Sequence, residues 1–181
     1  IWNTLIKTQR GYSFNASHTL AYSIEGLQEL NLAWKYPIIY WNCANLICDS
    51  GSLQSDDDSY DNDKTTNYGK IATAIANITK TGAKVGLPLI NSADYGFVPD
   101  EATDTIIFSL KAINGIGNEC VELIVKNRPY LSYEDFITRM IDTKNIKTSK
   151  MIKLIKAGCF TELDNEDTRT TMQKFLSESL L

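Results

Sequence analysis

Apolar side chains recur every three or four residues in the first part of the chain, which is the spacing of one face of an α-helix. The pattern predicts a helix over residues 17–36, with Ser17 as its N-cap, and a mostly buried helix over residues 38–48. A third helix is expected over residues 66–81, and Gly82 is expected to end it. The apolar face of the first helix is formed by Leu20, Ile24, Leu27, Leu30 and Trp34.

The pattern changes over residues 85–110, where glycine and proline interrupt the helical spacing. Two apolar segments, residues 97–98 and 106–108, flank a polar turn at residues 100–105. This arrangement predicts a short β-hairpin inside an otherwise helical chain.

Helical spacing resumes after residue 117, so we expect a mainly α-helical protein with one small β element. Ser132 and Asp135 are spaced as a capping box, and Thr148 is expected to cap the helix that follows. The helices expected in this part of the chain cover residues 118–127, 132–141, 148–157 and 166–180.

Two glycines flank one aliphatic residue directly before the first of these helices. Gly115 and Gly117 lack a Cβ, so the backbone can turn sharply and come close to a ligand. The N–H groups at a helix start can then hold a phosphate oxygen, while Ile116 is expected to point into the core. The pattern is typical of a helix-hairpin-helix, which binds the nucleic-acid backbone without reading bases, but it also fits an ordinary glycine turn. The whole segment is Ile113, Asn114, Gly115, Ile116, Gly117 and Asn118.

Residues 129–160 resemble a second, degenerate copy of this unit. Its loop, residues 144–147, lacks the two glycines, so contacts with phosphate would come from lysine side chains. A lysine run of this kind also occurs because it keeps a protein soluble, and both interpretations stay open. The lysines of the region are Lys144, Lys147, Lys150, Lys153 and Lys156.

The formal net charge of -4 argues against a free-standing basic nucleic-acid binder. The charge is unevenly distributed, however. Residues 1–110 carry 7 basic and 12 acidic side chains, residues 111–156 carry 9 and 5, and residues 157–181 carry 2 and 5. The basic excess therefore coincides with the glycine hairpin and its second copy.

Neither the cysteines nor the acidic residues are spaced as a metal site, and we expect this chain to bind no metal ion. The four cysteines form no CxxC pair and are expected to be buried free thiols. The acidic segment at residues 50–67 lacks the glycine and glutamate of a calcium loop, so a solvated, mobile loop is expected. The residues concerned are Cys43, Cys48, Cys120, Cys159, Asp56, Asp57, Asp58, Asp61 and Asp63.

No apolar run approaches the ~20 residues that a transmembrane helix needs, and no membrane partner is expected. The sequence shows no signal peptide, and Ile1 in place of a methionine suggests an excised fragment.

A second distinctive segment, residues 10–23, combines one arginine, several hydroxyl groups, the only histidine and three aromatic rings. An arginine beside a helix start favours an anion, and aromatic faces stack on bases. The residues fit a nucleotide site. They also fit a capped helix with a hydrogen-bonded histidine, which is the simpler interpretation without further context.

This segment closely resembles the Gly-Tyr-x-Phe-Asn-Lys-Ser/Pro-His-Ala stretch of the bacterial C-family replicative DNA polymerases, the alpha subunits of DNA polymerase III. The order and spacing of similar segments agree over about 160 residues. The amino-acid sequence of residues 32–37 and 40–42 more closely resembles the Gram-positive form of the family or a phage-encoded relative. The other segments that resemble the family are residues 28–37, 89–92, 108–125 and 152–160.

The resemblance implies two functional parts. Residues 1–109 would form the later part of the polymerase fingers, and residues 110–181 would form a tandem helix-hairpin-helix that holds duplex DNA. The family lysine of the fingers segment is replaced by Ala16, so one phosphate contact is missing or supplied elsewhere. The incoming deoxynucleoside triphosphate would contact Arg10, Ser13, Asn15, His18 and Tyr22, with Phe14 packed beneath them. Duplex DNA would contact Lys111, Gly115, Ile116, Gly117, Asn118, Lys144, Lys147 and Lys150.

The resemblance further implies a DNA-directed DNA polymerase, a nucleotidyltransferase, in the cytoplasm of a bacterium or a phage-infected cell. The palm aspartates of the family have no counterpart in this sequence, so Mg²⁺ is expected to bind elsewhere in the parent polymerase and the isolated fragment is expected to be inactive. Further expected partners are the rest of the polymerase chain and, through it, a sliding clamp. Residues 173–176 only weakly resemble a clamp-binding peptide and are interpreted as helix surface.

Two other hypotheses come from different classes of protein. One is a non-enzymatic accessory domain that keeps only the helix-hairpin-helix, and an intact fingers segment at residues 10–22 argues against it. The other is a helical protein-interaction domain, which would fail to bind DNA at low salt.

Overall fold

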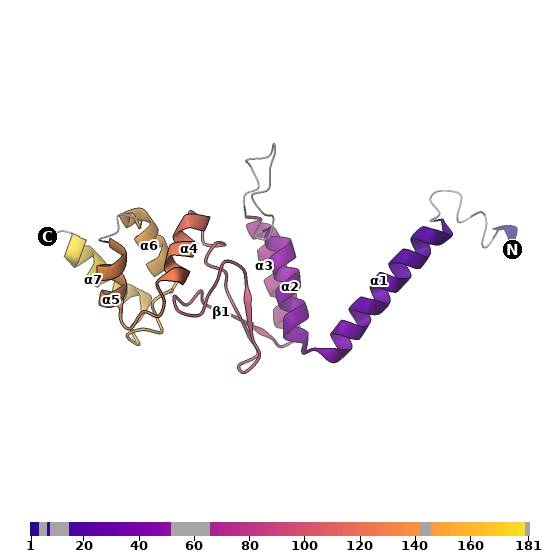
Figure 1. Ribbon diagram of the computed structural model, residues 1–181, viewed down its shortest axis with the longest axis horizontal. Helices are drawn as coiled ribbons and strands as arrows, with labels where there is room; N and C mark the ends of the chain where they lie inside the picture. Colours follow the sequence, from indigo (N-terminus) through magenta and orange to yellow (C-terminus); the bar gives the residue numbers. More distant parts are fainter. Residues whose placement is uncertain (4–6, 8–14, 52–65, 142–145, 180–181) are drawn as a thin grey trace. The chain divides into compact units, whose positions relative to one another are not determined.

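The computed structural model describes residues 1–3, 7, 15–51, 66–141 and 146–179. These residues form seven α-helices and three short strands, which confirms the mainly α-helical fold (Figure 1). The chain divides into two compact units, Ile1–Ile38 and Ile39–Leu181. The aspartates of the predicted acidic loop lie outside the described residues.

The first unit contains helix α1, Ala16–Lys35. The Asn15 side chain caps this helix, because it accepts hydrogen bonds from the His18 N–H at 2.8 Å and from the Ser17 hydroxyl at 2.9 Å. The prediction that Ser17 is the N-cap is therefore wrong. Two residues capable of capping lie two positions apart, and the one nearer the N-terminus takes the role.

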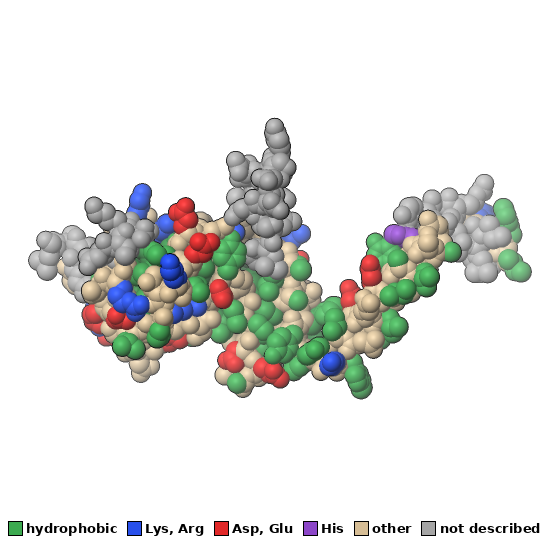
Figure 2. All heavy atoms as spheres, viewed as in Figure 1, with side chains coloured by type: hydrophobic (Ala, Val, Ile, Leu, Met, Phe, Trp, Pro, Cys, Tyr) green, Lys and Arg blue, Asp and Glu red, His purple; other side chains and the backbone are tan. Residues whose placement is uncertain are grey.

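The side chains of α1 are all at least partly exposed. None of its residues is buried, and 92% of Trp34 is accessible. Figure 2 shows apolar side chains, in green, along the length of this helix. The helical spacing read from the sequence is thus correct, but the described residues of this unit do not cover the apolar face.

The second unit contains a first hydrophobic core between helices α2 (Ile38–Ser50) and α3 (Tyr68–Lys80) and a small sheet. These two helices confirm the predictions of helices over residues 38–48 and 66–81. The N-cap of α3 is Asn67, whose side chain accepts a hydrogen bond from the Lys70 N–H at 3.0 Å. The larger buried side chains of this core include Ile39, Cys43, Leu46, Ile71, Phe97 and Ile106.

The sheet has three short strands in the order β1-β3-β2. Strands β2 (Val98–Asp100) and β3 (Thr105–Ile107) are antiparallel, which confirms the predicted hairpin. Its turn is held by Asp100, whose carboxylate accepts hydrogen bonds from the Ala102 N–H and the Thr103 hydroxyl. Strand β1 (Lys84–Gly86) pairs parallel to β3 and was not expected from the sequence.

A second hydrophobic core lies among helices α4 (Asn118–Lys126), α5 (Tyr133–Ile141), α6 (Thr148–Lys156) and α7 (Thr168–Ser179). All four helices were predicted. Aromatic rings form the centre of this core and meet edge to face at centroid distances of 4.8–5.4 Å. These rings belong to Tyr130, Tyr133, Phe136 and Phe160.

Two predicted helix caps have different outcomes. Ser132 accepts a hydrogen bond from the Asp135 N–H at 3.0 Å, as a capping box requires, but the Asp135 carboxylate accepts from the Leu131 N–H at 3.0 Å instead of from Ser132. The prediction that Thr148 caps α6 is wrong. The N-cap is Lys147, which makes no side-chain capping bond, and Thr148 is already helical.

Three of the four cysteines are buried free thiols, as expected, and burial raises the pKa of Cys43 to about 11. The expectation is wrong for Cys48, which is exposed. Within the residues that the structure describes, no helix is long and apolar enough to cross a membrane.

Candidate nucleic-acid interface

The glycine hairpin before α4 is held by two short backbone turns. The Ile113 N–H donates to the Leu110 carbonyl at 3.2 Å, and the Ile116 N–H donates to the Ile113 carbonyl at 3.0 Å. Gly115 has a φ of 81°, in the left-handed region that favours glycine. The hairpin therefore uses one of its glycines for a backbone conformation that most other residues avoid.

Ile116 fixes this hairpin to the second core. Only 3% of its surface is exposed, and it packs in the same cluster as Cys120, Val121 and Ile124 of α4. The expectation that Ile116 points inward is confirmed. An inward-pointing residue at the tip leaves the neighbouring backbone at the surface, where a ligand can reach it.

Gly117 has a different role from Gly115. It is the N-cap of α4, with a φ of -91° and a ψ of 173°, a conformation that any residue can adopt. A Cβ added there would meet no atom within 4 Å. The fold therefore does not require glycine at 117. Because glycine has no side chain to cap the helix, the first-turn N–H groups receive no side-chain acceptor from this residue.

The second copy of the helix-hairpin-helix, at residues 129–160, repeats this arrangement, as its degenerate sequence suggested. Helix α6 corresponds residue by residue to α4, so that Ile146 matches Ile116 and Lys147 matches Gly117. Ile146 is also buried, at 5% exposure, and Lys147 is an extended N-cap without a side-chain bond. The rest of the second loop, including Lys144, lies outside the described residues.

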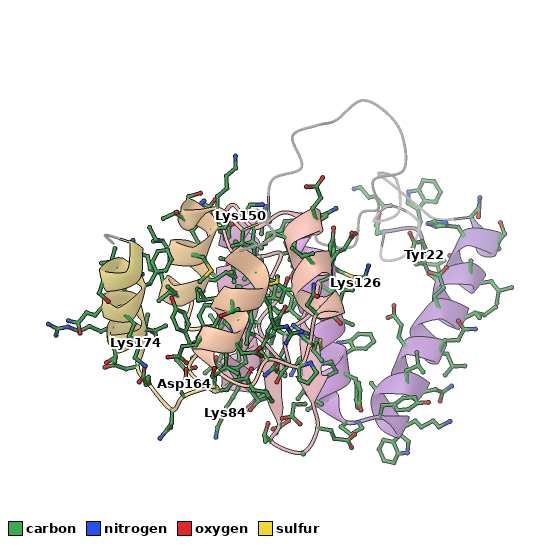
Figure 3. The ribbon with its side chains drawn as sticks, turned by 60° about the vertical axis from the view of Figure 1, so that its left-hand side comes forward. Tyr22, Lys84, Lys126, Lys150, Asp164 and Lys174 are labelled. Atoms are coloured by element: carbon green, nitrogen blue, oxygen red, sulfur yellow. The ribbon has the colours of Figure 1, made fainter. Side chains whose placement is uncertain are left out.

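The predicted DNA-binding lysines differ in their surroundings. Lys111 is not free: its ammonium donates to the Tyr95 hydroxyl at 2.5 Å and lies 4.5 Å from the centre of the Tyr95 ring. Lys147 is exposed and Lys150 is half-buried. Burial raises the pKa of the Cys120 thiol, and the charge of Lys150 partly opposes this rise. Lys150 lies on α6 and is labelled in Figure 3.

A polar network holds residues 90–93 against the base of the hairpin helices. Asn91 exchanges two hydrogen bonds with the backbone of Tyr130, at 2.8 and 2.9 Å. Arg128 donates to the carbonyls of Ile90, at 2.7 Å, and Ala93. Because the guanidinium is half-buried, desolvation lowers its pKa, although nearby carboxylates oppose this effect. Sequence reasoning assigned no role to Asn91 or Arg128, and only the family-like segment at residues 89–92 marked the place.

The predicted nucleotide-binding residues lie partly outside the described part of the chain. Arg10, Ser13 and Phe14 are among the residues that are not described. Asn15, His18 and Tyr22 lie together at the start of α1, where the rings of His18 and Tyr22 meet edge to face at 4.4 Å. Tyr22 is 59% exposed and is labelled in Figure 3. A shared pocket with Arg10 stays a prediction.

Metal binding has no support from the described part of the chain. In those residues, no group of three or more His, Cys, Asp or Glu side chains could hold a metal ion.

Comparison with known proteins agrees with this geometry. The model of the helix-hairpin-helix motif family matches residues 82–172. Over 98% of its length the chain is 49% identical to the probable DNA polymerase YorL of Bacillus subtilis (strain 168) and to the DNA-directed DNA polymerase of Bacillus phage SPbeta. It is 35% identical, over 85% of its length, to the DNA polymerase III subunit alpha of Chlamydia pneumoniae.

The chain spans only 14% of the first two relatives and 11% of the third. The resemblance to bacterial and phage replicative polymerases is confirmed, and it concerns one segment of much longer proteins. The chain belongs to the helix-hairpin-helix motif family.

Proposed function

We propose that this chain is a segment of a DNA-directed DNA polymerase and that it binds duplex DNA without reading its sequence. The observation that carries the proposal is the hairpin at Ile116, a buried anchor between two glycines that opens α4. Backbone N–H groups at such a helix start bind phosphate oxygens, which carry no sequence information.

The charge distribution sets the strength of this binding. The basic excess of residues 111–156 attracts the DNA backbone, whereas the acidic remainder of the chain repels it. We expect binding that is weak, with a dissociation constant on the order of micromolar or above at physiological salt, and strongly salt-dependent. Tight binding would require the rest of the polymerase.

The start of α1 supports a second role, contact with the incoming deoxynucleoside triphosphate. Asn15, His18 and Tyr22 place an amide, an imidazole and an aromatic ring on the first two turns of one helix. Rings of this kind stack on bases, and groups near a helix start favour phosphates. Arg10 and Ser13 would complete the contact, as the family resemblance implies.

Catalysis would need the parent polymerase. Nucleotidyl transfer by such enzymes is assisted by metal ions, and this chain contributes positioning of nucleotide and duplex. A sliding clamp would be reached through other parts of the parent chain. Phe175, the aromatic residue of the segment that weakly resembles a clamp-binding peptide, is only 3% exposed, so this segment is helix surface only in part.

The proposal is tested with the whole 181-residue chain, two unrelated duplexes and fluorescence anisotropy over a salt series. We expect equal affinities for both duplexes. Gly117→Val should weaken both equally, because its side chain blocks backbone approach while its φ is allowed. The matched control is Gly69→Val, at another helix start, where an added Cβ meets only Asn67 Oδ1 at 3.6 Å. If a folded Gly117→Val variant keeps its affinity for both duplexes, the hairpin is only a structural turn and does not bind DNA.

A further inference from the structure

Lys153 lies on helix α6, in the second copy of the helix-hairpin-helix, and its side chain lies across the glycine hairpin of the first copy. A Cβ built on Gly115 would collide with the Lys153 ammonium and would lie 3.2 Å from its Cε and 3.4 Å from its Cδ. The aliphatic stem and the charged end of this lysine therefore cover the face of Gly115. The absence of a Cβ at 115 thus permits both the positive φ and the approach of this side chain.

The charge of Lys153 is not neutralised within the described part of the chain. The ion pairs found there engage Arg139 and Lys174, and none engages Lys153. Lys174, labelled in Figure 3, shows the contrast: its ammonium lies 2.7 Å from a carboxylate oxygen of Glu166. A cation held beside a backbone turn without a carboxylate partner is available to an anionic ligand.

The repeat between the two helix-hairpin-helix copies shows that their shared architecture does not require Lys153. The position in α4 that corresponds to Lys153 is Leu123, which is partly buried against the second core. In α6 the same position carries a charge, and this charge reaches the glycine hairpin of the first copy.

We propose that Lys153 is a ligand for the DNA phosphate held at the hairpin of Gly115 and Gly117, so that both helix-hairpin-helix copies build one composite phosphate site. This inference rests on the duplex DNA binding proposed above. It adds a residue that the family resemblance did not assign. In this arrangement the backbone amides supply directional hydrogen bonds, and Lys153 supplies the charge that counterion release requires.

The test compares Lys153→Met, Lys153→Arg and Lys156→Met in the whole chain. Methionine keeps much of the apolar stem over Gly115, arginine keeps the charge, and Lys156 is an exposed lysine at the end of the same helix. Duplex affinity is measured by anisotropy from about 0.05 to 0.5 M salt. Thermal unfolding checks that each variant is folded.

The logarithm of the affinity falls linearly with the logarithm of the salt concentration, and loss of one phosphate contact makes this slope less steep by about 0.9. The Lys153→Met variant should therefore bind roughly eightfold more weakly at 0.1 M salt and about twofold more weakly at 0.5 M salt. Lys153→Arg should keep the slope, and Lys156→Met should change it much less.

Two failures are distinguishable. If the unaltered chain does not bind duplex DNA even at low salt, the proposed function fails and this inference fails with it. If the unaltered chain binds but Lys153→Met keeps its slope and affinity, or loses no more than Lys156→Met, the composite site alone is wrong.

Discussion

Replacing each of the two hairpin glycines by alanine should have different effects on the free energy of unfolding. Gly115 has a φ of 81°, and an alanine in the left-handed region costs about 1–2 kcal/mol. The added methyl group would also displace the flexible end of Lys153, which adds little energy because that end can move. We expect Gly115→Ala to lower the free energy of unfolding by about 1–2 kcal/mol.

Gly117→Ala should change the free energy of unfolding only a little. Its φ of -91° is ordinary for alanine, and a Cβ there meets no atom within 4 Å. The reduced freedom of the unfolded chain stabilises the alanine variant by about 0.4–1 kcal/mol. Because Gly117 is the N-cap, where glycine is preferred to alanine, a cost of similar size opposes this gain. The two variants should therefore differ by roughly 1–2 kcal/mol, which corresponds to about 2–8 °C in Tm for a chain of this size.

Urea unfolding followed by circular dichroism measures this difference, and calorimetry measures Tm. Equal stabilities of the two variants would refute the conformational argument, as would a Gly117→Ala protein less stable than Gly115→Ala. The comparison also separates fold from function. Any loss of DNA affinity in Gly117→Ala cannot come from strain at that residue.

The other predictions concern pH, catalysis and nucleotide binding. Hydrogen bonding to the Leu131 N–H, and then to Arg139, lowers the pKa of Asp135. The stabilisation of the fold by the ionised carboxylate is therefore present above the ordinary carboxyl range of about pH 4, and it is lost as the pH falls through the lowered pKa. Acid unfolding of Asp135→Asn should lack this pH-dependent stabilisation. Primer extension by the isolated chain with Mg²⁺ and four nucleotides should give no product, and templated incorporation would contradict the assignment of catalysis to the rest of the polymerase. In the full polymerase, Arg10→Ala or His18→Ala should raise the KM for nucleotide or lower kcat, and unchanged steady-state kinetics would remove these residues from the site.

The helices were predictable because their apolar spacing is local information. Helices α2 to α7 were all placed to within a few residues from periodicity, glycine and proline. Strand β1 was not predictable, because three residues carry no period and its pairing with β3 is a tertiary contact. The caps of α1 and α6 were misplaced by two residues and by one residue, because local spacing does not fix the residue at which a helix begins.

The hairpin itself was predictable, but its electrostatic surroundings were not. The pattern around Ile116 gave both the turn and the buried anchor. The contact of Lys111 with Tyr95, a residue sixteen positions earlier, is tertiary and was not predictable from local spacing. The contact of Lys111 with DNA stays a prediction. The placement of Lys153 against Gly115 is a tertiary contact between the two helix-hairpin-helix copies, so no rule of sequence spacing could reveal it.

The central claim, that the hairpin binds duplex DNA through its backbone, is tested most directly by amide chemical shifts in a heteronuclear NMR titration. Adding either of two unrelated duplexes should shift the backbone amides of Gly115, Gly117, Asn118 and Glu119 most, with the same pattern for both sequences. Shifts confined to α1 or α7, or a pattern that changes with the DNA sequence, would contradict the account.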